Sequence, residues 1–469
     1  DADRLRRRTK KDVEILLASQ TTKKVGDTII KRGEVYFGES ALERKQTGAY
    51  YTPEPLVRFL NEKTIVQPLR ELFEHEFRQR FNELLEQASD GHDASTRRGA
   101  AQSAAMLVHS FVEKTVLNFK ICDPAMGSGH FLVDAANQMA GLIVALLEEV
   151  PPVEGITISI SSRPNDWRRH ITRNCIYGVD LNPLAVNLSK LSLWLNCFAN
   201  EHKLTFLDHH IRCGSSLIGI RSISQLTSIP NRKNNGAQAK SKQTLLFDNK
   251  DLSRFLAKAA QGMASIAEVN EDDTESQKTI LGETLESISS LRPLADLHTA
   301  FLMTPGISED NYKEIFEYLA NGNSPKHTNP DLQKILDSVV AHRDWHHFYH
   351  WPLEFPDVFG PNTSGGFSVT VGNPPWDKLK PNSKEFFSSY DANFRTYKKP
   401  KANRVAKELM DNHPSIAKRW QEHKETLDKQ NKYFKQPATY EYLGNGDIDT
   451  FKLFLERSYQ LLAANSSMG

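Results

Sequence analysis

Four successive residues, Asn373 to Trp376, offer groups that together can hold a planar amine. The Asn373 side chain is a neutral carbonyl acceptor, and the carbonyl of Pro374 has a restricted direction because a second proline follows it. Trp376 adds a flat apolar face on which a ring can stack. An apolar run, 367–371, precedes the motif, so we expect a buried strand to deliver it to the edge of a sheet. A proline-rich turn that closes a strand is the simpler alternative.

A glycine-rich loop follows a second predicted strand, Phe119 to Asp123, and precedes an apolar helix, Phe131 to Leu147. The absent side chains of Gly127 and Gly129 let a ligand approach the backbone, and the start of the helix favours a negative group such as a carboxylate. The loop lacks the third glycine of a dinucleotide fingerprint and the Gly-Lys-Ser/Thr of a phosphate loop. Taken alone, it is explained equally well by a simple tight turn.

Asp180 closes a third predicted strand, Cys175 to Val179. An acidic side chain at this point can accept both hydroxyl protons of a ribose, and Leu181 can cover one face of an adenine. The alternative is that Asp180 or Asn182 caps the helix that follows. A ribose-binding carboxylate, a small-molecule loop and an Asn-Pro-Pro-Trp motif at three strand ends form a specific combination.

The alternation of strands and helices predicts an α/β fold with a parallel, doubly wound sheet. We count four strands, one of them formed by Ile211–Cys213 with Leu217–Ile220. Doubly wound sheets commonly hold about 5–7 strands, so the sheet is expected to be incomplete at the C-terminus. The predicted organisation is a basic N-terminal arm (1–46), a helical segment (47–120), a cofactor-binding half (121–220), a helical insertion (221–350) and a truncated catalytic half (351–469).

Leucines recur at helical spacing between Pro183 and Phe198, and core packing is expected to explain them. They are Leu184, Leu188, Leu191 and Leu195.

The composition is that of a soluble globular protein, with 39% hydrophobic and 25% charged residues in a chain of 469. No apolar run reaches the ~20 residues that span a bilayer, and four solitary cysteines predict reduced thiols in a cytoplasmic protein. His342, His346 and His350 have helical spacing, but no carboxylate or cysteine completes a set, so no metal site is expected.

In their order along the chain, these motifs resemble those of the gamma-class amino-group DNA methyltransferases. Residues 47–53 are similar to the upstream motif of that family, and Asp449 to Glu456 is similar to the helix motif that follows the catalytic one. More narrowly, the chain resembles the large methylases of type IIG/IIL restriction–modification and of the BREX and DISARM phage-defence systems. Residues 351–356, before the catalytic strand, are part of that likeness, which spans roughly residues 40–465.

The resemblance implies a Rossmann-like fold, the cofactor S-adenosylmethionine and a set of functional residues. The catalytic residues would be Asn373, Pro374, Pro375 and Trp376. The cofactor-binding residues would be Thr47, Tyr51, Thr52, Asp123, Ala125, Gly127, Gly129, Phe131, Asp180, Leu181, Ser215 and Asn373. Ser215 departs from the Asp or Asn usual in the family, so its contact with the cofactor adenine is expected to fall to a backbone amide. We expect the family's C-terminal target-recognition domain to lie outside this sequence, so that domain or other defence-system subunits are expected partners.

A basic segment from Lys378 to Arg419, interleaved with aromatic residues, follows the catalytic motif. We expect it to contact the phosphates of double-stranded DNA and to cover the active site, although a solvated helical surface would have the same composition. The residues expected to bind DNA are Lys378, Lys380, Lys384, Lys398, Lys399 and Lys401.

The function predicted from the sequence is methylation of adenine N6 in DNA by a base-flipping mechanism. Adenine is preferred to cytosine because the catalytic motif of this resemblance begins with Asn rather than Ser. Two alternatives remain open. One is a methyltransferase that acts on a glutamine amide of a protein, and the other is a non-catalytic DNA-binding or scaffold subunit that retains the fold.

Overall fold

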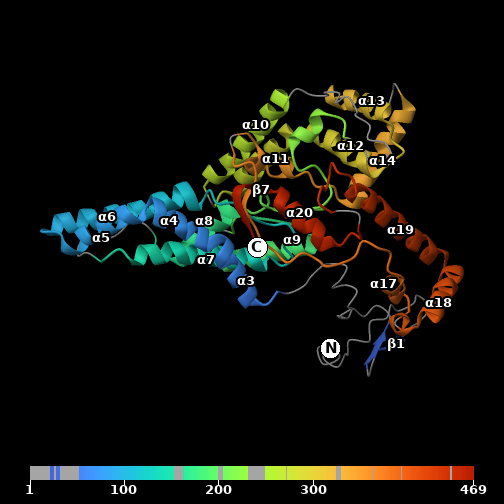
Figure 1. Cartoon of the computed structure of the whole chain (residues 1–469), viewed down its shortest axis with the longest axis horizontal. Helices are drawn as coiled ribbons and strands as arrows, with labels where there is room; N and C mark the ends of the chain where they lie inside the picture. Colours follow the sequence, from blue (N-terminus) through green and yellow to red (C-terminus); the bar gives the residue numbers. More distant parts are fainter. Residues whose placement is uncertain are drawn as a thin grey trace.

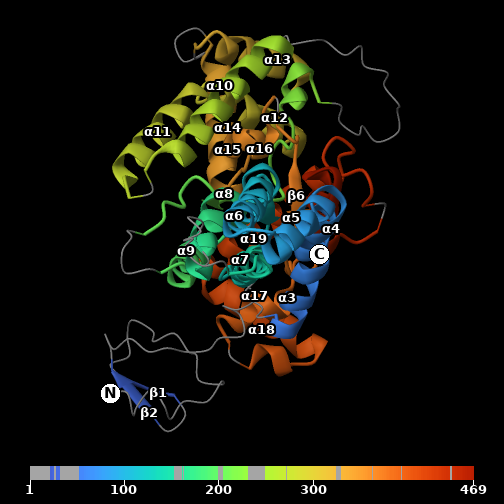
Figure 2. The ribbon, with the colours of Figure 1, turned by 90° about the vertical axis from the view of Figure 1, so that its left-hand side faces the viewer.

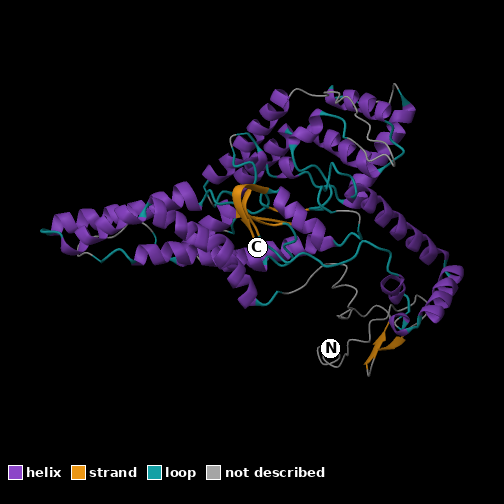
Figure 3. Cartoon of the chain, in the orientation of Figure 1, coloured by secondary structure: helices purple, strands orange, loops and turns teal. Residues whose placement is uncertain are grey.

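The computed structural model describes residues 22–25, 28–31, 52–152, 161, 163–198, 204–230, 249–270, 272–323, 329–361, 363–391, 393–443 and 446–469. A five-stranded sheet lies at the centre of the molecule, with helices around it (Figure 1, Figure 3). A short antiparallel pair, β1 (Thr22–Val25) and β2 (Thr28–Lys31), stands apart from this sheet.

The central sheet is parallel throughout and has the order β5-β4-β3-β6-β7. Its strand β3 occupies the middle, where it pairs with β4 on one side and with β6 on the other. The central strands are buried, as expected of parallel strands covered on both faces. The strand bounds are β3 Ile121–Asp123, β4 Ile176–Asp180, β5 Ile211–Cys213, β6 Phe367–Thr370 and β7 Leu462–Met468. The chain therefore has the parallel, Rossmann-like α/β fold that its sequence predicts.

Helix α7 (His130–Glu148) packs against β3 and β4 and also contacts α8 (Pro164–Cys175) and α9 (Pro183–Asn196). Of the described helices, α7 alone has the length and apolar content of a membrane-spanning segment. Ten of its residues are buried inside the structure, including Leu132, Met139 and Ile143. Its apolar character is thus explained by its place in the core.

The N-terminal helices form an elongated arm on one side of the sheet (Figure 1). The helix α3 (Glu54–Asn61) packs along α7, and α5 and α6 pack against each other. Two π-helical turns, Glu62–Val66 and Val112–Val116, interrupt this series. The remaining helices of the arm are α4 Gln67–Glu76, α5 Arg78–Asp90 and α6 Ala94–Phe111.

The helical insertion lies at the other side of the sheet and has its own apolar core, which includes Leu297, Phe301 and Phe316 (Figure 1). It begins after a 3-10 turn at Ile223–Thr227. Its helices are α10 Asn249–Glu268, α11 Thr274–Ser287, α12 Leu291–Met303, α13 Glu309–Ala320 and α14 Pro330–His346. An insertion between two halves of one α/β domain was expected over 221–350.

Two short helices, α15 (Trp351–Glu354) and α16 (Pro356–Phe359), fasten the insertion to the sheet. The buried Glu354 accepts a hydrogen bond from Arg292 of α12 at 2.6 Å and lies 3.8 Å from Arg212 of β5. In α16, Asp357 accepts a hydrogen bond from Tyr177 of β4. Glu354 and Asp357 thus connect these short helices to α12 of the insertion and to strands β4 and β5 of the sheet. The sequence gives no indication of these partners.

After β6 the chain forms a small helical unit that projects away from the sheet (Figure 1, Figure 2). Its core contains Phe387, Phe394 and Ile416. We call residues 383–434 the basic arm. It consists of α17 Ser383–Ser388, a 3-10 turn Phe394–Thr396, α18 Lys399–Asn412 and α19 Pro414–Phe434, and the chain then returns to the sheet through α20 Thr450–Gln460.

Three sequence-based expectations about the sheet and its helices are wrong. The count of four strands missed β7, which pairs with β6 through Phe367 and Leu462. The strand expected from Ile211–Cys213 with Leu217–Ile220 is shorter, because Leu217–Ile220 forms no strand and its carbonyls instead accept hydrogen bonds from residues 349 and 351. The leucine stripe of α9 is exposed, because the opposite face, with Val186 and Leu193, is the one that packs inward.

The exposed fractions of the four leucines are 72% for Leu184, 47% for Leu188, 47% for Leu191 and 67% for Leu195. Periodicity alone cannot say which face of a helix is buried when both faces are apolar.

Candidate active site at the carboxyl ends of three strands

The glycine-rich loop is held in shape by two buried carboxylates. Asp123, at the end of β3, accepts a hydrogen bond from the N–H of Ala125 at 2.9 Å. Asp180, at the end of β4, accepts hydrogen bonds from the N–H groups of Gly127 at 2.9 Å and Asn182 at 2.8 Å. Because β3 and β4 are adjacent and parallel, both carboxylates lie at the same edge of the sheet.

Both loop glycines have a left-handed backbone, with φ of 53° at Gly127 and 78° at Gly129. A Cβ at Gly129 would lie 2.4 Å from the Ser189 hydroxyl, so that glycine permits close packing of the loop on α9. A Cβ at Gly127 would meet no atom within 4 Å. The backbone is therefore accessible at Gly127, which fits a loop that holds a ligand.

The pKa of Asp123 is raised to about 8, chiefly by burial; the hydrogen bond from the Ala125 N–H opposes this rise, and the neighbouring Asp180 adds to it. Burial also raises the pKa of Asp180, whose two backbone hydrogen bonds act in the opposite direction. A cationic group placed beside the pair would favour the charged form of both carboxylates. The site can thus accommodate a ligand that carries positive charge.

On the other side of β3, strand β6 brings the Asn-Pro-Pro-Trp motif to the same edge of the sheet. The two strands approach closely here, since a Cβ at Gly372 would lie 2.6 Å from the Asp123 carboxylate. The side-chain nitrogen of Asn373 donates a hydrogen bond to the hydroxyl of Thr52 at 3.1 Å. This bond directs the amide so that its carbonyl oxygen remains available as an acceptor.

A pocket of about 460 Å³ joins the motif to the loop. It is bordered by Asp123, Pro124 and Ala125 from the loop and by Gly372, Asn373, Pro374 and Trp376 from the motif. Leu60 of α3 and Phe451, Phe454, Leu455 and Ser458 of α20 complete much of its wall. Its size is within the range of small-molecule sites.

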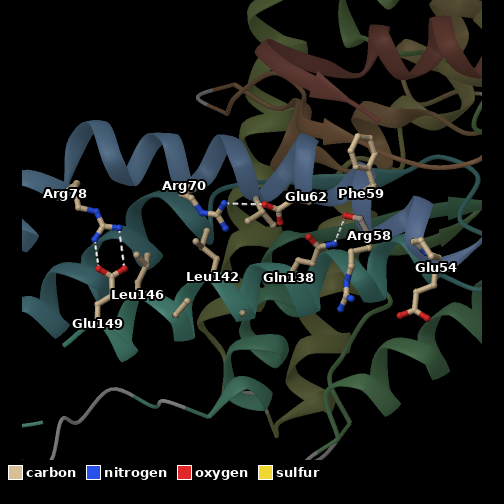
Figure 4. Close-up of a pocket in the computed structure, with 14 residues that line it drawn as sticks. Glu54, Arg58, Phe59, Glu62, Arg70, Arg78, Gln138, Leu142, Leu146 and Glu149 are labelled. Atoms are coloured by element: carbon tan, nitrogen blue, oxygen red, sulfur yellow. Dashed lines mark hydrogen bonds and ion pairs between the residues drawn. The ribbon is translucent and has the colours of Figure 1, made fainter. Parts of the chain in front are cut away.

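A larger cleft of about 860 Å³ lies elsewhere, between α7 and the helices α3 to α5 (Figure 4). Its rim carries the exposed ion pairs Arg70–Glu62 and Arg78–Glu149 (Figure 4). None of the residues predicted for cofactor or target binding lines this cleft. We therefore place the candidate active site in the smaller pocket, where the convergent polar groups are.

The remaining predicted cofactor residues fall into different environments. Leu181 is 53% exposed beside Asp180, whereas Phe131 is buried in the core. The N–H of Ser215 already donates to the carbonyl of His347 at 2.8 Å, so the expected amide contact with an adenine would have to share this group. Thr47 and Tyr51 lie outside the described residues.

All six lysines predicted to bind DNA are exposed: Lys378, Lys380, Lys384, Lys398, Lys399 and Lys401. Lys380 forms an ion pair with Asp447 at 2.7 Å, and Lys401 lies 4.0 Å from the centroid of the Tyr397 ring. The helices of the basic arm extend away from the sheet (Figure 1).

Thr450 and Phe451, at the start of α20, lie within the helix motif expected over 449–456, but no role in the site was predicted for them. The hydroxyl of Thr450 lies 2.5 Å from the carbonyl oxygen of Pro375. The Phe451 ring stacks on Trp376. A polar residue followed by an apolar helix was visible in the sequence, but its contact with a motif 75 residues away was not.

Two sequence families match parts of this chain. The Eco57I restriction-modification methylase family matches residues 174–406, which include Asp180 and the Asn-Pro-Pro-Trp motif. The DNA-methyltransferase domain of the MmeI family matches residues 99–215, which include the glycine-rich loop.

A protein of Methanocaldococcus jannaschii, named as a type II restriction enzyme and methyltransferase, is 24% identical over 385 residues. The alignment covers 74% of this chain and 30% of that relative, so the chain spans about a third of the relative's length. These matches confirm the resemblance read from the motifs: over most of its described length, the chain is similar to the DNA methyltransferases of restriction–modification systems.

Proposed function

We propose that this protein transfers a methyl group from S-adenosylmethionine to the N6 amine of adenine in DNA, as the modification component of a restriction–modification or phage-defence system. The orientation of Asn373 carries the proposal. Its side-chain nitrogen donates a hydrogen bond to Thr52, so its carbonyl oxygen is left as an acceptor for the amine of a substrate. This group borders the same pocket as Asp123, Pro124 and Ala125, where the glycine-rich loop begins.

The residues at the strand ends fit the proposed cofactor. Asp180 would accept the ribose hydroxyls, and the open backbone at Gly127 would receive the methionine part. The two buried carboxylates suit its positive charge. When bound, S-adenosylmethionine supplies an electrophilic methyl group.

The chain's own contribution to the reaction is to hold and polarise the amine. The lone pair of adenine N6 is delocalised into the ring, so the amine is a poor nucleophile. Hydrogen bonds from that amine to Asn373 and to the Pro374 carbonyl would favour a pyramidal nitrogen and stabilise its developing positive charge. The acidity of the nitrogen rises once it is methylated, so no strong base is required beforehand.

The target base must leave the duplex to reach this pocket. We propose that Trp376, which is 71% exposed, stacks on the extruded base. Base–aromatic stacking contributes about 1–3 kcal/mol and offsets part of the unstacking cost. The exposed lysines of the segment after the motif would contact the flanking phosphates.

We further propose that sequence recognition comes from another domain or subunit, since the restriction enzyme and methyltransferase of M. jannaschii extends far beyond the aligned part. We expect the protein to act in the cytoplasm, where its DNA substrate would be.

Transfer of labelled methyl groups from S-adenosylmethionine to DNA, followed by digestion to nucleosides, tests this function. We expect the label in N6-methyladenine. Label in N4-methylcytosine would overturn the choice of base, and label in protein would favour a glutamine methyltransferase. Failure to bind S-adenosylmethionine in isothermal titration would favour a non-catalytic scaffold, the alternative that the unusual Ser215 supports.

Asn373→Ala should abolish transfer and leave the affinity for S-adenosylmethionine within about threefold of the wild type, since the deleted acceptor serves the amine. Isothermal titration and the labelled-methyl assay measure the two effects separately. Undiminished turnover in this variant would contradict the role of Asn373.

A further inference from the structure

The indole of Trp376 is supported on one face by a residue from a distant part of the chain. Its ring and that of Phe451 are stacked, with centroids 5.3 Å apart and an interplanar angle of 27°. Phe451 is the second residue of α20, whereas Trp376 lies in the loop after β6. Both residues border the pocket that contains Asn373. Trp376 nevertheless remains 71% exposed, so much of its surface is free.

The distance between the two rings decides which face of Trp376 can receive a base. A base inserted between them would need about 7 Å, which is two stacking separations of about 3.4 Å each. The observed separation of 5.3 Å is too small. A base can therefore stack only on the side of the indole that faces away from Phe451.

The neighbouring residue, Thr450, holds the backbone on both sides of Trp376. Its hydroxyl donates to the carbonyl of Pro375 at 2.5 Å and accepts from the N–H of Asp377 at 2.8 Å. Its own N–H donates to the carbonyl of Asp377 at 2.8 Å. Nearby, the N–H of Leu379 donates to the carbonyl of Ile448 at 3.1 Å. The start of α20 thus fixes both the loop and the ring.

We propose that Thr450 and Phe451 are positioning residues that set the plane of Trp376 for the extruded base. The inference rests on the proposed function and goes beyond it. Phe451 acts on the target through Trp376 and does not touch the base. In this arrangement the stacking surface is ordered before DNA binds, so less conformational freedom is lost when the base arrives.

A double-mutant cycle on methyl transfer separates this role from a general structural one. Phe451→Ala should lower kcat/KM for DNA about tenfold, the upper range for loss of an aromatic pair, with S-adenosylmethionine affinity unchanged. In a Trp376→Ala background, Phe451→Ala should have no further effect. Phe451→Tyr should restore activity. An equal loss in both backgrounds, or no loss in either, would overturn the proposal.

Fluorine NMR of protein labelled with 5-fluorotryptophan gives a readout that needs no activity. The Trp376 resonance is assigned by its absence in Trp376→Phe. Phe451→Ala and Thr450→Val should each shift or broaden this resonance, whereas the matched control Tyr459→Ala, on the same helix and 63% exposed, should leave it unchanged. An unaltered Trp376 resonance in both test variants would sink the proposal.

These two measurements distinguish the possible failures. If the wild-type protein methylates no DNA, the proposed function fails, while the NMR result still decides whether α20 holds the indole. If Phe451→Ala does not fold, Phe451→Leu retains apolar volume without a ring and replaces it in both experiments. Retained wild-type kcat/KM and an unchanged spectrum in that variant would count against the proposal.

Discussion

Two carboxylates, Asp123 and Asp180, connect the glycine-rich loop to the sheet. Each carboxylate accepts at least one hydrogen bond from a backbone N–H in the segments that follow β3 and β4, so the shape of the loop depends on both. This arrangement buries both acidic groups, and burial raises the pKa of each. The types and order of the residues predicted that Asp180 would lie close to the loop. That Asp123 is buried beside Asp180 follows only from the pairing of β3 with β4, which the sequence does not show.

The raised pKa of Asp123 predicts a pH-dependent stability. Its folded-state value is about 8, against 3.8 for an unperturbed group, so the folded protein holds a proton that the unfolded chain releases. The resulting stabilisation is fully present below about pH 4 and is lost as pH rises through about 8. Asp123→Asn should therefore lose less stability than the wild type between pH 5 and pH 9.

Urea unfolding of the ligand-free protein at several pH values measures this difference. The exposed Asp90 provides the control, because Asp90→Asn should follow the wild-type profile. Parallel profiles for Asp123→Asn and the wild type would show that Asp123 does not carry a buried proton.

At the scale of elements, the alternation of strands and helices was enough to predict the parallel sheet, its central strands and the insertion. The edge strand β7 was missed because its sequence, Leu-Ala-Ala-Asn-Ser-Ser-Met, has little β-propensity and is only half-buried. The exposed face of α9 was assigned to the core because both faces of that helix are apolar. Long-range interactions such as that of Thr450 with Pro375 depend on tertiary packing and leave no local pattern.

The ion pairs of Glu354 with Arg212 and Arg292 connect the insertion to the sheet, so removing the Glu354 charge should lower the stability of the folded protein. Glu354→Gln should lower the free energy of unfolding by about 3 kcal/mol, because it leaves Arg212 and Arg292 without their buried counter-charge. Glu62→Gln removes a comparable but exposed pair with Arg70 and should cost less than about 1 kcal/mol. Equal costs in the two variants, measured by urea unfolding, would show that the Glu354 pairs are energetically ordinary.

Replacements on the two faces of α9 test which face is buried. Leu188→Gln and Leu191→Gln should each change the free energy of unfolding by less than about 0.5 kcal/mol, since both leucines are exposed. Leu193→Ala should cost about 2–5 kcal/mol, since Leu193 is fully buried. The exposed stripe should also promote self-association, which the two Gln variants would reduce in sedimentation velocity. A large destabilisation by Leu188→Gln would restore the core interpretation.

For the molecule as a whole, the N-terminal helices extend from one side of the sheet, whereas the insertion and the basic arm lie on the other, where α19 packs against α12 (Figure 1, Figure 2). The candidate active site lies at the edge of the sheet, and the basic arm begins shortly after the Asn-Pro-Pro-Trp motif. We propose that a duplex delivering a base to Trp376 contacts the lysines of that arm. The net charge of +1 conceals this local concentration of positive charge.

Charge reversal on the basic arm should weaken DNA binding uniformly across sequences. We expect Lys398→Glu with Lys399→Glu to lower affinity and to reduce the slope of log K against log salt by about 1 for each phosphate that the variant no longer neutralises. Lys334→Glu, on the insertion and 77% exposed at its side chain, is the matched control and should leave the slope unchanged. Fluorescence anisotropy across a salt series measures both effects. Identical slopes for the two variants would place DNA elsewhere.

The pairing of β3 with β6 joins strands that are far apart in the chain, as the 248-residue separation of Lys120 and Ser368 shows. During synthesis at about 5–20 residues per second, the open edge of β3 must wait on the order of 10–50 s for its partner. The ribosome will have released both the N-terminal helices and the insertion before the pocket of the candidate active site can close. Nascent chains stalled ahead of β6 therefore present an unpaired strand edge, and chaperones that recognise such edges are expected to bind at that stage.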